Sequence, residues 1–365
     1  MKALTVGGAM IDTIAIIESR RIERMAMTNV DRSFLLLEEG RKTEALEIST
    51  HTGGGAVNTA VALARLGGDV AALVKLGRDQ RAETILARLM EEGISTRWVL
   101  RDAREPTGAS VLVSSHERNA AVFTFRGANG LLEPQDLKPD AFAVDLVYVA
   151  GLSNRSAERF AEIIGTAKAR GAKVAANPGI RQLSARGSEI LDLASSIDVL
   201  AINRIEAEAL VPQLVARFED DRALPPADGG GPLPRLVERG LHGGGHDMGL
   251  LGFMRALARL GCPAVLLSDG GNGVYLGTPD TLRHCPAHKV TVAGTAGAGD
   301  ALASTFSGLW TSGEAAEVAL RAATLNAASV VTYVDTQTGL LTRDALDRRV
   351  AETAASLPIR TWKLG

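Results

Sequence analysis

One acid follows a glycine-rich turn in the stretch "TAGAGDALASTFSGL", residues 295–309, between an apolar run and a helical pattern. A helix that begins at such a turn exposes free backbone N–H groups and the positive end of its dipole, and glycines let a phosphate approach them. Asp300 would repel that phosphate, but it can accept the proton of a hydroxyl that attacks it. We therefore predict phosphoryl transfer, with Asp300 as an ionised base of ordinary acidity and Gly297, Ala298 and Gly299 as the anion hole. A strand–helix turn that Asp300 merely caps is the alternative.

A second glycine turn lies in "THTGGGAVNTAVALARLGG", residues 50–68. Its three glycines, residues 53–55, expose backbone, and Asn58 in the first helical turn can both donate to a hydroxyl and accept from one. Asp12, just after the first apolar run, adds a carboxylate that can accept from two neighbouring hydroxyls. Together these residues predict a polyol site that faces the anion turn.

The elements that must position these turns alternate along most of the chain. Short apolar runs such as "DVAALVKLG" are followed by amphipathic patterns such as "AETILARLMEEGI". This alternation is typical of crossover units, which build a mostly parallel sheet covered by helices on both faces. Ligands bind outside the carboxyl ends of the strands in such sheets. We therefore predict an α/β fold in which both glycine turns lie at that edge.

Two segments interrupt the alternation and look like strand pairs without a helix. Residues 28–50 resemble two strands around a Glu-Gly turn, and residues 107–125 resemble a hairpin. We interpret 28–50 and 107–125 as a small β lid, and 1–27, 51–106 and 126–365 as the α/β body. Because such a lid has open edges that a second chain can cover, we expect a homodimer through it. Two decorative hairpins are the alternative.

Bulk properties restrict the class of protein further. The chain has 365 residues with a formal net charge of -2 and no basic block, so we expect no nucleic-acid partner. It has no apolar run of membrane-spanning length, no signal-peptide pattern and two cysteines without metal spacing, so we expect a cytoplasmic protein without a membrane partner. The Gly- and Pro-rich stretch 220–249 contains His242 and His246 without further ligands, which favours surface histidines over a metal site.

Several of these motifs resemble one known family in the right order along nearly the whole chain. "GGGAVNTAVALARLG" with "VKLGRD" is similar to the first signature of the ribokinase-like (PfkB) carbohydrate kinases, and "GTAGAGDALASTFSGLW" to their second. "FRGANGLL", "ANPG" and "INRIEAEAL" look like further landmarks of that family. The resemblance implies a ribokinase-like α/β body with a β-sheet lid. It also implies an ATP-dependent kinase that phosphorylates a primary hydroxyl of a sugar or nucleoside, with Mg²⁺ accompanying ATP.

The resemblance also implies roles for single residues. Asp300 matches the catalytic base, beside the anion hole already described. The residues that match ligands of substrate hydroxyls are Asp12, Gly54, Gly55 and Asn58. The residues that match the nucleotide side, with Mg²⁺ near Glu206, are Asn203, Glu206, Ser268, Gly270, Gly273 and Asn326. For Asn203 and Glu206 a plain helix cap, and for Asn326 an ordinary helix position, are the alternatives.

The sequence departs from the family at one functional position and leaves the substrate open. Gly294 stands where relatives carry an aspartate that helps to bind a monovalent cation, which puts potassium activation in doubt. A phosphosugar kinase would need cations that converge, for which Arg118, Arg126 and Lys75 are candidates. A nucleoside kinase would need a base slot, for which the lid segments offer Phe34, Phe123 and Phe125. A ligand sensor that kept the fold is the third alternative. A dinucleotide oxidoreductase is disfavoured, because no strand is followed by the dinucleotide-binding glycine pattern.

Overall fold

A computed structural model describes residues 1–18, 23–27, 32–36, 40, 42–115, 120–218, 221–225 and 231–364. Its body is built on a nine-stranded sheet in the order β19-β18-β17-β16-β13-β12-β11-β1-β6. The strands from β6 to β16 run parallel, and the last three pair antiparallel at one side. In sheet order the strands are β19 (Arg360–Lys363), β18 (Thr281–Cys285), β17 (Val274–Gly277), β16 (Val265–Ser268), β13 (Val199–Asn203), β12 (Lys173–Ala176), β11 (Leu146–Val149), β1 (Lys2–Val6) and β6 (Asp69–Leu73).

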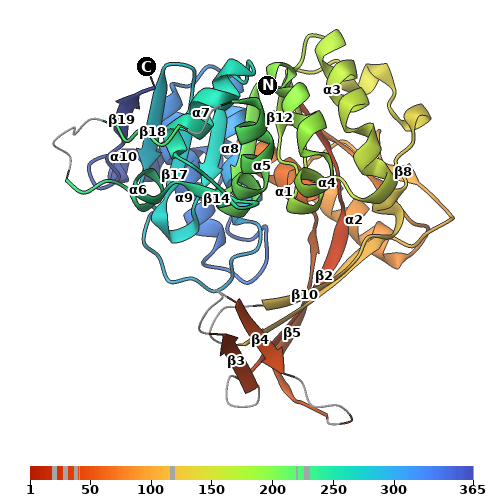
Figure 1. Ribbon diagram of the computed structural model, residues 1–365. Coiled ribbons are helices and arrows are strands. Elements are labelled where there is room, and N and C mark those ends of the chain that lie inside the picture. The colour runs from red at the N-terminus through yellow and green to blue at the C-terminus, as the bar shows by residue number, and fades with distance from the viewer. Residues whose placement is uncertain are drawn as a thin grey trace.

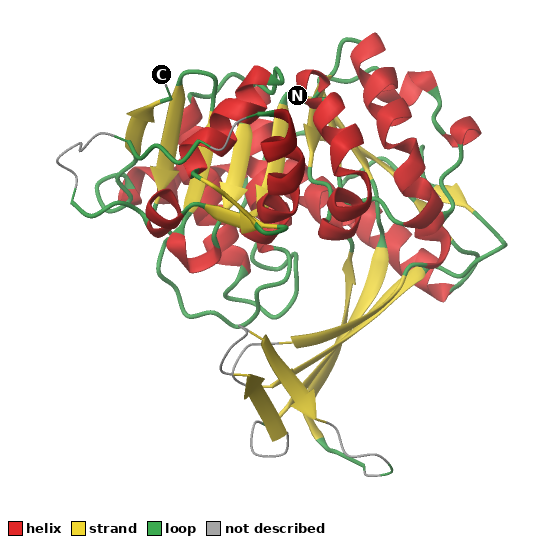
Figure 2. Cartoon of the chain, viewed as in Figure 1, coloured by secondary structure: helices red, strands yellow, loops and turns green. Residues whose placement is uncertain are grey.

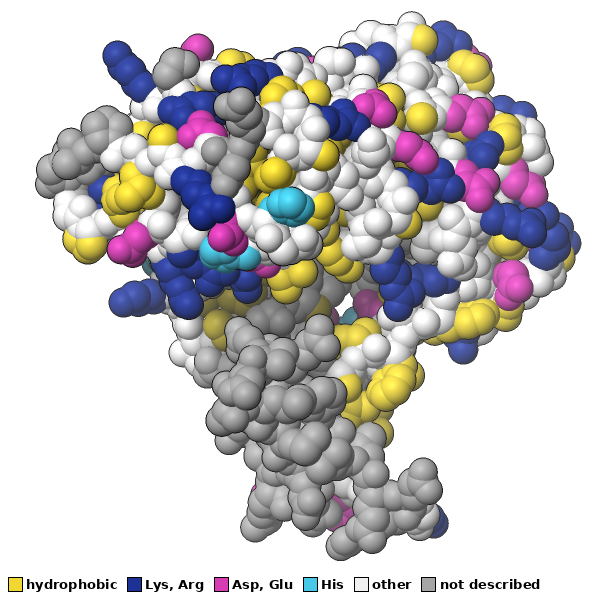
Figure 3. All heavy atoms as spheres, in the orientation of Figure 1, with side chains coloured by type: hydrophobic (Ala, Val, Ile, Leu, Met, Phe, Trp, Pro, Cys, Tyr) yellow, Lys and Arg dark blue, Asp and Glu magenta, His cyan; other side chains and the backbone are white. Residues whose placement is uncertain are grey.

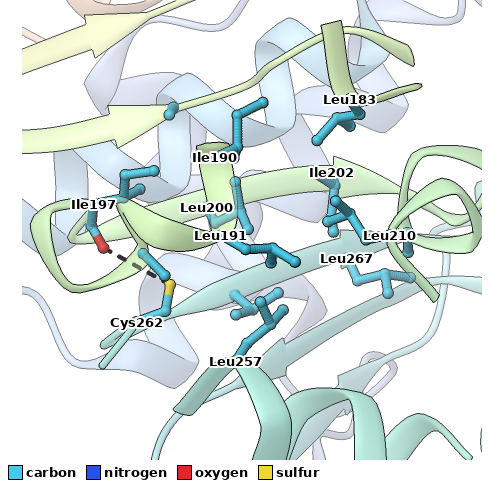
Figure 4. Packing of buried hydrophobic residues seen from close by; sticks show 14 of the residues in the cluster. Leu183, Ile190, Leu191, Ile197, Leu200, Ile202, Leu210, Leu257, Cys262 and Leu267 are labelled. Atoms are coloured by element: carbon cyan, nitrogen blue, oxygen red, sulfur yellow. Dashed lines mark hydrogen bonds between the residues drawn. The ribbon is translucent and has the colours of Figure 1, made fainter. Parts of the chain in front are cut away.

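Helices cover both faces of this sheet, as the alternating pattern predicts (Figure 2). Because both faces are buried, the strands are apolar at nearly every position rather than at every second one. The helices on one face are α1 (Gly55–Arg65), α2 (Gln80–Glu91), α8 (Ala298–Thr311), α9 (Ala316–Val330) and α10 (Arg343–Thr353). The helices on the other face are α3 (Phe160–Ala169), α4 (Ile180–Asp192), α5 (Arg204–Arg217), α6 (Arg235–Arg239) and α7 (Leu250–Arg259). Figure 4 shows strand and helix side chains of this second face in contact, including Leu200, Leu210 and Leu257.

A second, four-stranded sheet projects from the body (Figure 1), and we call it the lid. Its order is β10 (Ala120–Phe125), β9 (Gly108–Ser115), β2 (Met10–Ile17) and β5 (Ala45–Gly53). The expected lid segments 28–50 and 107–125 contribute three of these strands. The expected body segment 1–27 contributes the fourth, β2, which pairs with β5 and β9. In the sequence, β2 is an apolar run that follows β1 directly, so it is assigned to the body. Its pairing with β5 and β9 cannot be seen from the sequence.

Two strands flank the Glu-Gly turn within 28–50, as expected, but they do not pair with each other. The strand β4 (Arg32–Leu36) pairs with β3 (Glu23–Met27), whereas β5 pairs with β2. The Gly- and Pro-rich stretch 220–249 includes α6 and a hairpin of β14 (Leu241–Gly243) and β15 (His246–Met248). His242 and His246 are exposed there, and His242 Nδ1 lies 2.5 Å from Asp247 Oδ1. Within the part of the chain described, no helix combines the length and apolar character needed to cross a membrane.

Candidate active site

Asp300 lies in the first turn of α8, at the edge where the parallel strands end. The residue that precedes this helix is Gly297, whose φ of 79° favours glycine. A Cβ at Gly297 would lie 2.7 Å from the Cβ of Thr336, so the turn is also too tightly packed for any other residue. Asp300 does not cap the helix, because its Oδ2 instead accepts a hydrogen bond of 2.8 Å from Asn58 Nδ2. The carboxylate therefore points toward α1 and makes no capping hydrogen bond with its own helix.

The second glycine turn joins β5 to α1 and lies against the same carboxylate. Gly54 has a φ of 95°, and a Cβ there would lie 2.5 Å from the carbonyl oxygen of Gly8. A Cβ on Gly55 would lie 3.6 Å from Asp300 Oδ1. The buried Asn58 follows in the first turn of α1. The structure thus brings the two predicted glycine turns and their polar residues together, although 242 residues separate Asn58 from Asp300.

Asp12 enters the site from the lid. It pairs with Ser110 on one neighbouring strand and with His51 on the other, so the three side chains share one face of the lid. The Ser110 hydroxyl donates to Asp12 Oδ1. The other oxygen, Oδ2, lies where a Cβ on Gly53 would stand, 1.9 Å away, so only glycine leaves room for it. This face presents a partly buried carboxylate to the glycine turns.

The two acids are less acidic than an aspartate in water, so the predicted ordinary acidity of Asp300 is wrong. Loss of hydration on burial raises the pKa of Asp300, and the nearby charge of Asp12 raises it further. The hydrogen bond from Asn58 acts in the opposite direction. Burial also raises the pKa of Asp12, against the hydrogen bond from Ser110 and the charge of His51. Carboxyl groups whose pKa is raised by burial and by a specific charged neighbour are typical of functional sites.

A cavity of about 890 Å³ opens beside the N-terminus of α8. Four of the six predicted nucleotide residues line it, together with two anion-hole residues: Asn203, Ser268, Gly270, Gly273, Ala298 and Gly299. Asn203 and Ser268 are direct partners on β13 and β16, which explains why residues so far apart in the sequence share a wall. Apolar side chains including Val274, Val290 and Leu302 line the rest of the cavity. An apolar slot that leads to a glycine anion turn fits a base at one end and phosphates at the other.

Asn203 and Glu206 form the helix cap named above as the alternative to a nucleotide role. Asn203 Oδ1 accepts from the backbone N–H of Glu206 at 3.0 Å, and Glu206 Oε2 accepts from that of Asn203 at 2.9 Å. Burial raises the pKa of Glu206, and the charge of Asp300 adds to it. The cap does not exclude a role toward phosphate, because Oε1 of Glu206 has no hydrogen-bond donor among the described residues.

Asn326 has a purely structural environment in the described chain. It is fully buried, and its Nδ2 donates to Thr305 Oγ1 at 2.8 Å while its Oδ1 accepts from the backbone N–H of Leu341 at 2.9 Å. It does not line the cavity, whereas its neighbours Thr324 and Ala327 do. The expectation that Asn326 lies near the adenine is therefore not supported. On a helix with one face on the core, a residue displaced by one or two positions changes face.

Two neighbouring residues of the site escape sequence analysis. Thr336 Oγ1 donates to Asn58 Oδ1 at 2.8 Å, and Gln337 Nε2 donates to the same oxygen at 3.1 Å. Both residues lie in an irregular segment between α9 and α10, with no turn signature or periodicity that points to a site. The Asn58 oxygen is occupied by these donors, so toward a substrate this residue retains only an N–H group. Ser110 and His51 likewise lie within strand patterns that do not indicate a site.

The residues proposed from the sequence to determine substrate specificity lie in different environments. Lys75 is buried among three carboxylates, with Nζ 2.7 Å from Asp136 and 3.3 Å from Asp102, so it is not free to bind a phosphate. Phe123 and Phe125 are exposed on the lid face opposite to Asp12, so they do not form a base slot over the site. Arg118 and the side chain of Phe34 lie outside the described residues.

The fold and the site together define a phosphotransferase that acts on an alcohol group, and comparison with known proteins agrees. The chain belongs to the pfkB family of carbohydrate kinases, whose profile it matches over residues 21–224 and 254–343. A deoxyribokinase of Salmonella typhi is 27% identical over 330 residues, which cover 89% of this chain and 94% of that protein. This confirms the resemblance found in the sequence and identifies a sugar or nucleoside kinase.

Solved structures confirm the ribokinase-like fold with its lid. The ribokinase of Thermotoga maritima superposes with a TM-score of 0.70 at 21% identity, over 96% of this chain and 99% of that one. An Arabidopsis thaliana ribokinase complexed with ribose and ATP superposes with a TM-score of 0.67 at 19% identity, over 95% of this chain and 97% of that one.

Proposed function

We propose that this protein transfers the γ-phosphoryl group of ATP to a primary hydroxyl of a sugar or nucleoside, with Asp300 as general base. The observation that carries this proposal is the position of Asp300. Its carboxylate lies between a polyol-binding arrangement, formed by Asp12, Gly54 and the Asn58 N–H, and the anion turn at the mouth of the 890 Å³ cavity. A hydroxyl held against Asp12 would face the base and the phosphoryl group at the same time.

The proposed step moves one proton and one phosphoryl group. Asp300 accepts the hydroxyl proton as the hydroxyl oxygen forms a bond to the γ-phosphorus, and the bond to the β–γ bridging oxygen breaks to release ADP. The N–H groups of residues 297–300 hold the equatorial oxygens of the transferring group. Burial raises the pKa of the Asp300 carboxyl group, which increases its affinity for the proton that it accepts.

The residues of the cavity fit ATP accompanied by Mg²⁺. The apolar wall suits a base, and the turn from Ser268 to Gly273 suits the ribose and phosphates. Within the described residues no group of three His, Cys, Asp or Glu forms a metal site on its own, so Mg²⁺ would take most ligands from phosphates and water. Glu206 is the carboxylate we propose to face that ion. When bound, Mg²⁺ neutralises the phosphate charge that develops during transfer.

Substrate screening tests this function directly. We would measure ADP release with a panel of pentoses, deoxypentoses, hexoses and nucleosides, together with sugar acids and sugar phosphates. Stoichiometric ADP formation with at least one neutral sugar or nucleoside supports the proposal. ATP binding without turnover on any member would instead favour the ligand sensor.

Arg126, with Arg155 and Arg181 near it, favours a second candidate function: a kinase whose substrate carries an anionic group. The guanidinium of Arg126, which follows β10, has no ion pair or hydrogen bond with any described residue. Burial lowers its pKa, and the charge of Arg181 in the first turn of α4 lowers it further. Arg126 also lines a cavity of about 320 Å³ together with Arg155. Unpaired, partly buried guanidinium groups bind carboxylate or phosphate well.

This second candidate predicts a selective effect on the acidic members of the panel. Arg126→Met should raise the KM of a sugar acid or sugar phosphate at least tenfold and leave the KM of ATP unchanged, if such a substrate is the natural one. Arg348→Met, on the exposed face of α10, is the matched control. An unchanged KM of Arg126→Met for the acidic members of the panel would dismiss this candidate.

We also propose that two copies pair through the lid. The lid face opposite to Asp12 exposes large apolar side chains on three strands: Leu46, Ile48, Val111, Phe123 and Phe125. Their exposed fractions are between 44% and 68%. Figure 3 shows hydrophobic side chains on the described surface of the lid. A contiguous apolar face of this kind is typical of an interface between chains.

A further inference from the structure

The side chain of Gln337 links the lid, α2 and α1 from a buried position. It is 4% exposed and uses both ends of its amide. Nε2 donates to the carbonyl oxygen of Thr52 at 3.0 Å and to Asn58 Oδ1 at 3.1 Å. Oε1 accepts from Arg88 Nε at 3.1 Å and from Thr52 Oγ1 at 3.2 Å. Every hydrogen-bonding group of this side chain therefore has a partner.

Two of these partners determine which way the amide points. A guanidinium group can only donate and a backbone carbonyl can only accept, so Arg88 selects Oε1 and the Thr52 carbonyl selects Nε2. The atom of Asn58 that faces Nε2 must then be its oxygen. The nitrogen of Asn58 is consequently turned toward Asp300, at 2.8 Å from Oδ2.

We propose that Gln337 is a positioning residue for the phosphoryl transfer, which keeps the Asn58 amide turned so that only an N–H group faces the Asp300 carboxylate. This inference rests on the proposed role of Asp300 as base. With the amide reversed, the Asn58 oxygen would face the carboxylate and repel it. Burial and the charge of Asp12 raise the pKa of Asp300, and the Asn58 hydrogen bond opposes them. Gln337 thus favours the ionised form of Asp300 through a second residue, with Thr336 as an additional donor.

Gln337→Met tests this proposal, because it removes the donor with little change in size or charge. We expect kcat at neutral pH to fall roughly tenfold or more, with a smaller change in the KM of ATP, because one hydrogen bond to a charged group is lost. The acid limb of the pH–rate profile should move to higher pH. Gln80→Met, an exposed glutamine at the start of α2, is the matched control and should leave both unchanged.

The ionisation of Asp300 can also be followed without turnover. The carboxyl carbon of ¹³C-labelled aspartate gives a titration curve, and the Asp300 resonance is assigned by its absence in Asp300→Asn. We expect its midpoint to move upward in Gln337→Met. Since this readout needs no substrate, a failure of the positioning role is separated from a failure of the proposed kinase activity.

A double-mutant cycle decides whether Gln337 acts through Asn58. In an Asn58→Leu background, Gln337→Met should produce no further shift of the midpoint. An equal shift in both backgrounds, or an unchanged midpoint in the wild-type background, would overturn the proposal. If Gln337→Met does not fold, Gln337→Leu also removes the donor without adding a charge, so the same upward shift and the same cycle apply, with Gln80→Leu as its control.

Discussion

Burial raises the pKa of Asp300. The higher pKa increases the affinity of the carboxylate for a proton and lowers the stability of the folded protein at neutral pH. We predict that Asp300→Asn lowers kcat by about 10²–10⁴, because an amide cannot accept the hydroxyl proton. ATP binding should persist, since the cavity wall is unchanged. An intact rate with the best substrate of the panel would show that another group is the base.

The same substitution should stabilise the protein at neutral pH, rather than leave its melting temperature unaffected as an aspartate of ordinary acidity would. The folded pKa of Asp300 is raised above its unfolded value, so the folded state binds more protons between the two values. Stability is therefore lost as pH rises through that interval. Calorimetry should find Asp300→Asn more stable than wild type at pH 8, and the difference should shrink toward about pH 4. An equal difference at both pH values would contradict the raised pKa.

Gly294 sets the expectation for monovalent cations. A Cβ there would lie 3.1 Å from the carbonyl oxygen of Tyr333 and 3.3 Å from that of Val334, so the position faces backbone oxygens but offers no carboxylate. Because a hard cation is held most strongly by anionic oxygens, we predict little change in rate when potassium replaces tetramethylammonium. A severalfold activation would show that the carbonyl groups alone bind potassium.

At the scale of elements, the turn before α8 predicts opposite outcomes for two neighbouring glycines. Gly297→Ala should cost about 1 kcal/mol or more of stability, because φ is positive and the new Cβ meets Thr336. Gly299→Ala should leave stability nearly unchanged, because nothing lies within 4 Å of its Cβ. It should still lower kcat, since the methyl group enters the cavity at the anion turn. Urea unfolding and ADP release measured on both variants check this pair.

The elements that hold the base and the substrate could be predicted from the sequence because each one carries a local signal. Glycines before a helical pattern reveal the turns at Gly54 and Gly297, and apolar runs reveal the strands that lead to them. The residues that orient the side chains of the site could not be predicted. Gln337 and Thr336 act through contacts across more than 270 residues of chain, and Ser110 looks like any polar residue of a lid strand. The assignment of β2 to the lid likewise depends on pairing that no local pattern encodes.

At the scale of the whole molecule, the apolar face of the lid predicts the oligomeric state. Phe123→Asp should convert a dimer into monomers in light scattering, because it places a charge on the strand β10 within that face. Val318→Asp, on a partly exposed position of α9, is the control and should not change the mass. A wild-type protein that is monomeric at micromolar concentration would contradict the interface.

The positions of Asp12 in the lid and Asp300 in the body affect how readily water can take the place of the acceptor and hydrolyse ATP. Asp12 lies on the lid strand β2 and Asp300 lies in the body, and the neighbouring lid strand β5 runs directly into the body at the glycine turn before α1. A polyol can contact both parts at once, whereas a single water molecule is too small to join them. We therefore expect water to be a poor acceptor even when ATP is bound.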